Sequence, residues 1–102
     1  MDKREAIDLA KQYAALAVRE LDPDKIVLFG SVLNGNFTDE SDIDVAVIFD
    51  GFMGDWFGAY TRLSKIRRGV SPYIEPVLLD SADDASGFVK EILAKGEVIF
   101  QR

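Results

Sequence analysis

Two short apolar runs are joined by a connection too short to hold a long helix. The runs "KIVLF" (25–29) and "IDVAVIF" (43–49) are rich in β-branched and aromatic residues and are typical of buried strands. Only the 13 residues at 30–42 separate them, and these show no helical periodicity. Because a parallel connection usually needs a crossover helix, we expect a mixed β-sheet.

The rest of the chain alternates between helical and β-type patterns. Apolar residues spaced by three and four positions, such as Ala10, Ala14 and Ala17, form a stripe typical of a helix. Pro76 lies inside "YIEPVLL" and cannot donate to a strand ladder, so we expect this strand at a sheet edge or bulged at Pro76. The expected elements are helices at 4–21, at 56–68 between a cap at Asp55 and a stop at Gly69, and from near Asp83 to Gly96, with further strands at 73–79 and 97–101.

Length and composition limit both the fold and the chemistry. The 102 residues, 48% of them apolar, suit a single α/β (α+β-like) domain spanning 1–102, with a small mixed sheet of three to four strands flanked by helices. Cysteine and histidine are absent, which excludes disulfides, thiolate metal sites and the usual neutral-pH base. Any catalysis must therefore rest on carboxylates, hydroxyls, Lys, Arg and the backbone.

The charge and hydropathy of the chain limit its partners. A net charge of −6 argues against direct nucleic-acid binding, since that binding relies on Lys and Arg. No run approaches the roughly 18 apolar residues of a membrane span. The charged start "MDKREAIDLAKQ" also lacks the apolar core of a signal peptide. We therefore expect a cytoplasmic protein that binds no membrane.

Two acidic residues stand where the second strand begins. Because strand side chains alternate, Asp42 and Asp44 point to one face, while Ile43 and Val45 point to the other. Neighbouring carboxylates repel each other, so folding alone gives no reason for this arrangement. It suits Mg²⁺, which binds one or two carboxylates together with substrate phosphates. An isolated Asp-x-Asp is more often a solvated strand end, so the neighbouring residues decide.

Gly30 and Ser31 follow the first strand and supply groups that suit an anion. A glycine here lets the backbone approach a ligand, and Ser31 with the following N–H groups can bind phosphate. Ser31 is equally suited to cap a short helix. Glu75, the only acid inside "YIEPVLL", would be the third carboxylate of a two-metal site, and its alternative role is an edge-strand surface acid.

Two familiar nucleotide and metal motifs do not fit this stretch. "GSVLNG" has the glycine spacing of a P-loop, but Asn36 and Phe37 replace the required Lys and Ser/Thr. An EF-hand loop from Asp39 would need an acid or Asn at its fifth position and Gly at its sixth, where Ile43 and Asp44 stand. The specific signal is therefore the combination of a strand, Gly-Ser, a further Gly and Ser-Asp-x-Asp.

In this combination the chain resembles the nucleotidyltransferase superfamily, and within it the minimal nucleotidyltransferases (MNT) of prokaryotes. The later strand also offers the third carboxylate of the family pattern, Glu75. Two positions depart from that pattern. Asn34 stands where many members carry Arg, and Glu75, followed by Pro76, stands where the third acid is often Asp. The matching residues are Gly30, Ser31, Gly35, Ser41, Asp42 and Asp44.

The resemblance implies an enzyme that moves a nucleoside monophosphate from a nucleoside triphosphate to an acceptor hydroxyl. We expect AMP from ATP, although another triphosphate would serve the same chemistry. Asp42, Asp44 and Glu75 would be the catalytic and metal-binding residues of a two-Mg²⁺ site, with Glu75 as general base. The nucleotide-binding residues would be Gly30, Ser31, Gly35 and Ser41.

The resemblance also implies a partner. Minimal nucleotidyltransferases resemble the antitoxin half of a pair with an all-helical HEPN toxin, whose tyrosine they adenylylate. The alternative is a catalytically weak binding subunit that neutralises such a partner by contact alone. Assembly into a homo-oligomer is a separate alternative. A direct nucleic-acid-binding module is the third and least favoured class at this net charge.

The loop "DGFMGDWFG" (50–58) and the basic stretch 62–68 are candidates for the partner contact. Apolar residues on a glycine-containing loop are typical of interfaces, so we expect this loop and the 62–68 face to contact a helical partner that covers the carboxylate end of the sheet. The alternative is that the loop folds back on its own helix. Trp56 and Phe57 can stack on a base, but core packing is the favoured role. A solvated helix face is the simpler interpretation of the basic cluster, Arg62, Lys65, Arg67 and Arg68.

Overall fold

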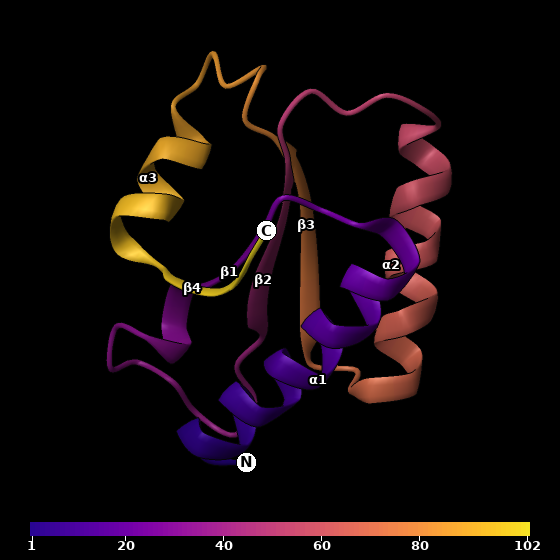
Figure 1. Cartoon of the computed structure of the whole chain (residues 1–102). Coiled ribbons are helices and arrows are strands. Elements are labelled where there is room, and N and C mark those ends of the chain that lie inside the picture. The colour runs from indigo at the N-terminus through magenta and orange to yellow at the C-terminus, as the bar shows by residue number, and fades with distance from the viewer.

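Helices cover both faces of a four-stranded sheet in the computed structural model, which describes residues 1–102 (Figure 1). α1 and α2 lie on one face of the sheet, and α3 lies on the other. No helix is long and apolar enough to cross a membrane. The elements in chain order are α1 (Lys3–Leu21), β1 (Lys25–Phe29), the 3₁₀ turn η1 (Gly30–Val32), β2 (Ile43–Phe49), α2 (Trp56–Val70), β3 (Ile74–Asp80), α3 (Phe88–Lys95) and β4 (Glu97–Gln101).

The sheet is mixed, as the short connection 30–42 predicts. Its strand order is β3-β2-β1-β4, in which β1 is antiparallel to β2 and β4, while β2 and β3 are parallel. The one parallel pair is joined through α2, the crossover helix that this connection requires. β3 is an edge strand, so the missing N–H of Pro76 removes no bond from a central ladder.

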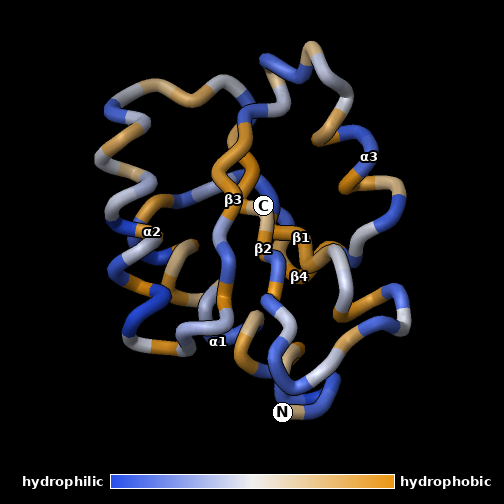
Figure 2. Tube along the Cα trace, turned by 180° about the vertical axis from the view of Figure 1, so that it is seen from behind, coloured by the Kyte–Doolittle hydropathy of each residue, from blue (hydrophilic) through white to orange (hydrophobic).

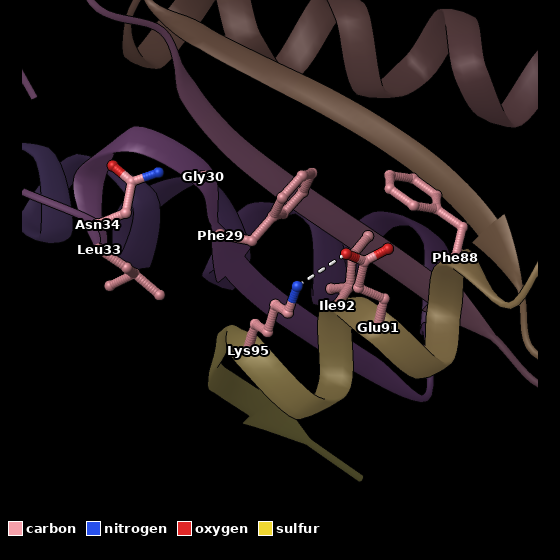
Figure 3. Close-up of a pocket in the computed structure, with 8 residues that line it drawn as sticks. All are labelled: Phe29, Gly30, Leu33, Asn34, Phe88, Glu91, Ile92 and Lys95. Atoms are coloured by element: carbon pink, nitrogen blue, oxygen red, sulfur yellow. Dashed lines mark hydrogen bonds and ion pairs between the residues drawn. The ribbon is translucent and has the colours of Figure 1, made fainter. Parts of the chain in front are cut away.

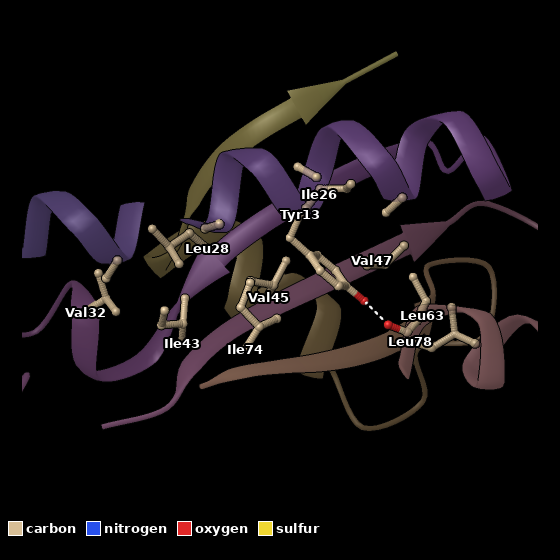
Figure 4. Close-up of a cluster of buried hydrophobic side chains, with 14 of the residues drawn as sticks. Tyr13, Ile26, Leu28, Val32, Ile43, Val45, Val47, Leu63, Ile74 and Leu78 are labelled. Carbon is tan, nitrogen blue, oxygen red and sulfur yellow. Dashed lines mark hydrogen bonds between the residues drawn. The ribbon is translucent and has the colours of Figure 1, made fainter. Parts of the chain in front are cut away.

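The larger core cluster lies between the sheet and the α1–α2 layer. Figure 4 shows Tyr13 of α1 reaching into it, where its hydroxyl donates to the Leu63 carbonyl of α2 at 2.9 Å. Burial raises the pKa of Tyr13 well above its usual value, so this donor stays protonated. On the opposite face, Val89 and Ile92 of α3 pack on Val27, Ala46 and Ile48. Figure 2 shows the same arrangement as apolar strands within more polar helices and loops.

The ends of α2 differ from the prediction. Asp55 occupies the N-cap position, but its side chain makes no capping hydrogen bond. The helix also continues through Gly69 to Val70, where the prediction ended it. One glycine near a helix end costs only about 1 kcal/mol relative to Ala, which packing of the helix against β3 can offset.

The start of α3 was predicted several residues too early. The helix begins at Phe88, because Gly87 adopts a left-handed conformation with φ of 77°. The acids expected inside the helix lie in the preceding turns, where the Asp84 carboxylate accepts hydrogen bonds from the N–H groups of Val89 and Lys90 at 2.9 and 3.1 Å. Asp84 therefore caps this helix from outside it.

The loop that follows β2 lies at the wrong end of the sheet for the predicted partner contact. Asp44 stands near the start of β2 and the loop begins after Phe49, so the length of the strand separates them (Figure 1). The loop also folds back, since the Phe52 ring packs between Phe49 and Trp56 with ring centroids 4.9 and 5.2 Å apart. Phe57, predicted to pack in the core, is 82% exposed.

Candidate functional site

The turn after β1 lies directly against the acidic start of β2. Gly30 has φ of 82°, a conformation that favours glycine, and begins the η1 turn. A Cβ atom on Gly30 would lie only 2.3 Å from Oδ2 of Asp44. The absence of a side chain at Gly30 is therefore what gives the Asp44 carboxylate its place beside the turn.

The strand pairing places two of the three predicted acids on one face of the sheet. Asp44 of β2 pairs with Glu75 of β3 on one side and with Phe29 of β1 on the other. Directly paired residues point to the same face, which is the face that α3 covers further along the strands. Asp42 lies in the connection just before β2 and is exposed. The three acids predicted to act together are thus neighbours in space.

The pKa of Asp44 reports how close these charges are. Partial burial raises it above the ordinary value, and the negative charges of Asp42 and Glu75 raise it further. The three carboxylates do not form a ready-made metal cluster, because no three acidic side chains converge at metal-binding spacing.

Glu75 has a cationic neighbour that sequence analysis did not identify. Nη1 of Arg67 lies 3.7 Å from Oε2 of Glu75, and the same nitrogen approaches the Ile74 carbonyl at 3.5 Å. The Arg67 Nε is buried without a hydrogen-bond partner. Arg67 was predicted only as part of a basic helix face, and nothing in its spacing from Glu75 signals the contact.

The remaining predicted nucleotide-binding residues shape the connection 30–42. Ser31 lies in η1, whose first N–H groups have no partner within the turn. Gly35 has φ of 84° and open space around it. The Ser41 hydroxyl accepts from the Thr38 N–H at 2.9 Å, so it closes the turn that leads to Asp42. Their contacts to a nucleotide stay predictions.

The donor set suits a hard divalent cation. Every candidate ligand is a carboxylate oxygen, the kind of ligand that Mg²⁺ prefers. Gly30 leaves room for the Asp44 carboxylate, while Asp42 and Glu75 supply further negative charge beside it. These residues therefore fit Mg²⁺.

We predict that Asp44→Asn makes the metal-free protein more stable at neutral pH. A raised pKa means that the folded protein holds the Asp44 proton more tightly than the unfolded chain. Its favourable contribution is therefore present below the ordinary value of 3.8 and is lost as pH rises through the folded pKa. The gain should be at most about 1 kcal/mol, because the half-exposed carboxylate is screened by solvent.

Urea unfolding in EDTA measures this gain, with Asp8→Asn on the exposed face of α1 as the control. The difference between Asp44→Asn and wild type should shrink at acidic pH and in millimolar Mg²⁺. A variant that is clearly less stable than wild type in EDTA would mean that Asp44 is held by a favourable structural interaction instead.

A pocket of about 290 Å³ adjoins the Gly30 turn on the α3 side (Figure 3). Its walls are mostly apolar, and Phe29 meets Phe88 edge-on with ring centroids 6.2 Å apart. The polar groups at its mouth come from η1 and its C-terminal flank on one side and α3 on the other. The lining residues are Phe29, Gly30, Leu33, Asn34, Phe88, Glu91, Ile92 and Lys95, and we call this the α3 pocket.

Comparison with a family profile agrees with this geometry. The profile for the family described as polymerase beta, nucleotidyltransferase matches residues 11–102, which include every predicted site residue. No curated protein sequence matches the chain significantly.

Solved structures share the fold at low sequence identity. A Sulfolobus solfataricus protein provisionally assigned as a nucleotidyltransferase is 19% identical, with a TM-score of 0.71 over 98% of this chain and 84% of its own. A chain of a toxin–antitoxin complex with AMP-PNP is 21% identical, with a TM-score of 0.64 over 90% of this chain and 73% of its own. A chain of the complex between tri-AMPylated Shewanella oneidensis HEPN toxin and MNT antitoxin is 19% identical, with a TM-score of 0.60 over 93% and 72%.

Proposed function

The chain belongs to the polymerase beta nucleotidyltransferase family, and on this premise we propose that it transfers AMP from ATP to a hydroxyl group of a HEPN-type partner protein. One observation carries the proposal. The Gly30 turn, suited to phosphate, lies against the Asp44 carboxylate, suited to a phosphate-bound cation. A triphosphate lying across this contact would meet both kinds of group at once.

Each residue has a distinct task in the proposed reaction. Asp42 and Asp44 hold Mg²⁺, and Ser31 with the N–H groups of its turn holds the β- and γ-phosphates. When bound, Mg²⁺ supplies positive charge that stabilises the entering and leaving oxygens. Glu75 accepts the proton of the acceptor hydroxyl. The hydroxyl oxygen bonds to the α-phosphorus, the bond to the bridging oxygen breaks, and pyrophosphate leaves.

Arg67 has a part in placing Glu75. Its guanidinium is held between α2 and β3 and offers one charged contact to the Glu75 carboxylate at 3.7 Å. That contact orients the Glu75 carboxylate at the start of β3. Since both side chains are partly exposed, the ion pair is weak enough for Glu75 to turn toward a substrate.

The partner is proposed from the structural neighbours. Two of them come from toxin–antitoxin complexes, and one of these contains an AMPylated HEPN toxin. Bimolecular transfer requires both reactants to be oriented, so the acceptor hydroxyl must enter beside Glu75. We therefore place the partner over the start of β2 and β3, together with the last turn of α2, and not on the loop 50–58.

A second candidate function is neutralisation of the partner by contact alone. Two observations favour it. Asn34 supplies no charge beside the phosphate-binding turn, and Glu75 is already paired with Arg67. In this case the fold would serve as a binding surface, and transfer would be slow or absent.

Incubation with ATP labelled at the α-phosphate tests the two candidates. We expect label on the helical protein encoded beside this chain, only when Mg²⁺ and both proteins are present. Formation of a stable complex without label would establish the contact-only alternative. Absence of both label and complex would contradict the assignment of a HEPN-type partner.

A further inference from the structure

The strand order places the acids and the α3 pocket on opposite sides of the Gly30 turn. Glu75, Asp44 and Phe29 are successive neighbours across β3, β2 and β1. The α3 pocket begins at Phe29 and Gly30 and extends toward α3. A ligand whose α-phosphate lies at the acids and whose next phosphates meet Gly30 and Ser31 therefore points its far end into the mouth of this pocket.

The α3 pocket offers one positive charge, the ammonium group of Lys95. Figure 3 shows this side chain extending from α3 toward Phe29, with Nζ bound to Oε1 of Glu91 at 3.0 Å. The side chains of Lys95 and Glu91 are 76% and 57% exposed, so their ion pair is worth little. A phosphate would be the stronger partner, because it carries more charge and accepts short charge-assisted hydrogen bonds.

Asn34 lines the same pocket as Lys95, and its side-chain amide has a free hydrogen-bond donor. Its Oδ1 accepts a hydrogen bond from the Asn36 N–H at 3.3 Å, which fixes the side chain beside the turn. The amide NH₂ group is left to donate. Asn34 and Lys95 both line the pocket, so one neutral donor and one cation lie at the same opening.

We propose that Lys95 and the Asn34 amide bind the terminal phosphate of the nucleoside triphosphate. This inference rests on the proposed nucleotidyl transfer and assigns groups that hold the leaving pyrophosphate portion. Lys95 exchanges its Glu91 partner for the phosphate when the triphosphate binds. The side chains of Phe29, Leu33 and Phe88 line the same pocket and form its apolar wall.

The proposal predicts opposite effects on ATP binding when the charges of Lys95 and Glu91 are removed. Lys95→Gln should weaken binding of ATP by about tenfold, the effect of losing one charge-assisted contact. Glu91→Gln should tighten it several-fold, because Lys95 loses its competing partner and the phosphate loses a repelling charge. Lys95→Arg should stay close to wild type, and AMP, which lacks the terminal phosphates, should bind all variants equally.

Calorimetry with ATP, inorganic tripolyphosphate and AMP, each with Mg²⁺, measures these effects on the full chain. Lys90→Gln is the matched control, since it removes an exposed charge from α3 outside the pocket. ATP and tripolyphosphate should weaken together in Lys95→Gln and not in Lys90→Gln. Equal binding by these two variants, with wild type binding ATP, would overturn the role of Lys95 alone. Failure of wild type to bind any triphosphate would instead overturn the proposed function and this inference with it.

Discussion

Asp44→Asn is expected to lower the rate of AMP transfer by about a thousandfold or more, while the protein stays folded and becomes slightly more stable in EDTA. Asn keeps the size of the side chain but removes the charge that would hold the cation beside Gly30. A substitution that raises the free energy of unfolding but lowers activity marks a residue that is kept for function at a cost in stability.

The measurement is the initial rate of α-phosphate label transfer, with unfolding by urea measured on the same preparation. Asp8→Asn serves as the control, because it removes a charge from the exposed face of α1, outside the site. A variant with near wild-type transfer would remove Asp44 from the catalytic machinery.

Gly30→Ala is expected to lower the rate of AMP transfer at least a hundredfold, because it changes the geometry of the site and not its charge. The new Cβ would lie 2.3 Å from Oδ2 of Asp44, so the carboxylate must move away from the turn. A displacement of about 1 Å at a reacting centre can cost a hundredfold in rate. The left-handed backbone, with φ of 82°, adds roughly 1–2 kcal/mol of destabilisation.

Gly51→Ala is the control that distinguishes the effect of backbone strain from the effect of moving the Asp44 carboxylate. Gly51 has nearly the same φ, 81°, but nothing lies within 4 Å of its Cβ position, and it follows the opposite end of β2. Both variants should lose similar stability, as measured by urea unfolding, and only Gly30→Ala should lose transfer. Equal transfer rates for the two variants would show that Asp44 does not depend on the space beside Gly30.

The sequence was sufficient for the sheet because the relevant signals are local. A connection of 13 residues without helical periodicity argues against a crossover helix, and the structure has β1 antiparallel to β2. Pro76 likewise indicates an edge or bulged strand through its missing donor, and β3 is at the edge with a continuous register. The strand period also predicts which face Asp44 shares with Ala46 and Ile48, and these two residues do pack on the α3 side of the sheet.

The features that sequence reasoning missed depend on contacts between distant segments. The start of α3 is set by the left-handed Gly87 and by Asp84, which sequence patterns alone do not reveal. The loop after β2 was predicted at the site because it is close in sequence, but a seven-residue strand carries it to the far end of the sheet. The contact of Arg67 with Glu75, and that of Gly30 with Asp44, require the folded sheet and α2 together.

The most direct test of the proposed transfer compares ATP labelled at the α-phosphate with ATP labelled at the γ-phosphate. Both are incubated with Mg²⁺, this chain and its helical partner, and the partner is examined for label and the solution for pyrophosphate. The proposed reaction predicts α-label on the partner, no γ-label, and one pyrophosphate released for each nucleotide attached. Transfer of γ-label, or a neutralised partner that carries no label at all, would contradict it.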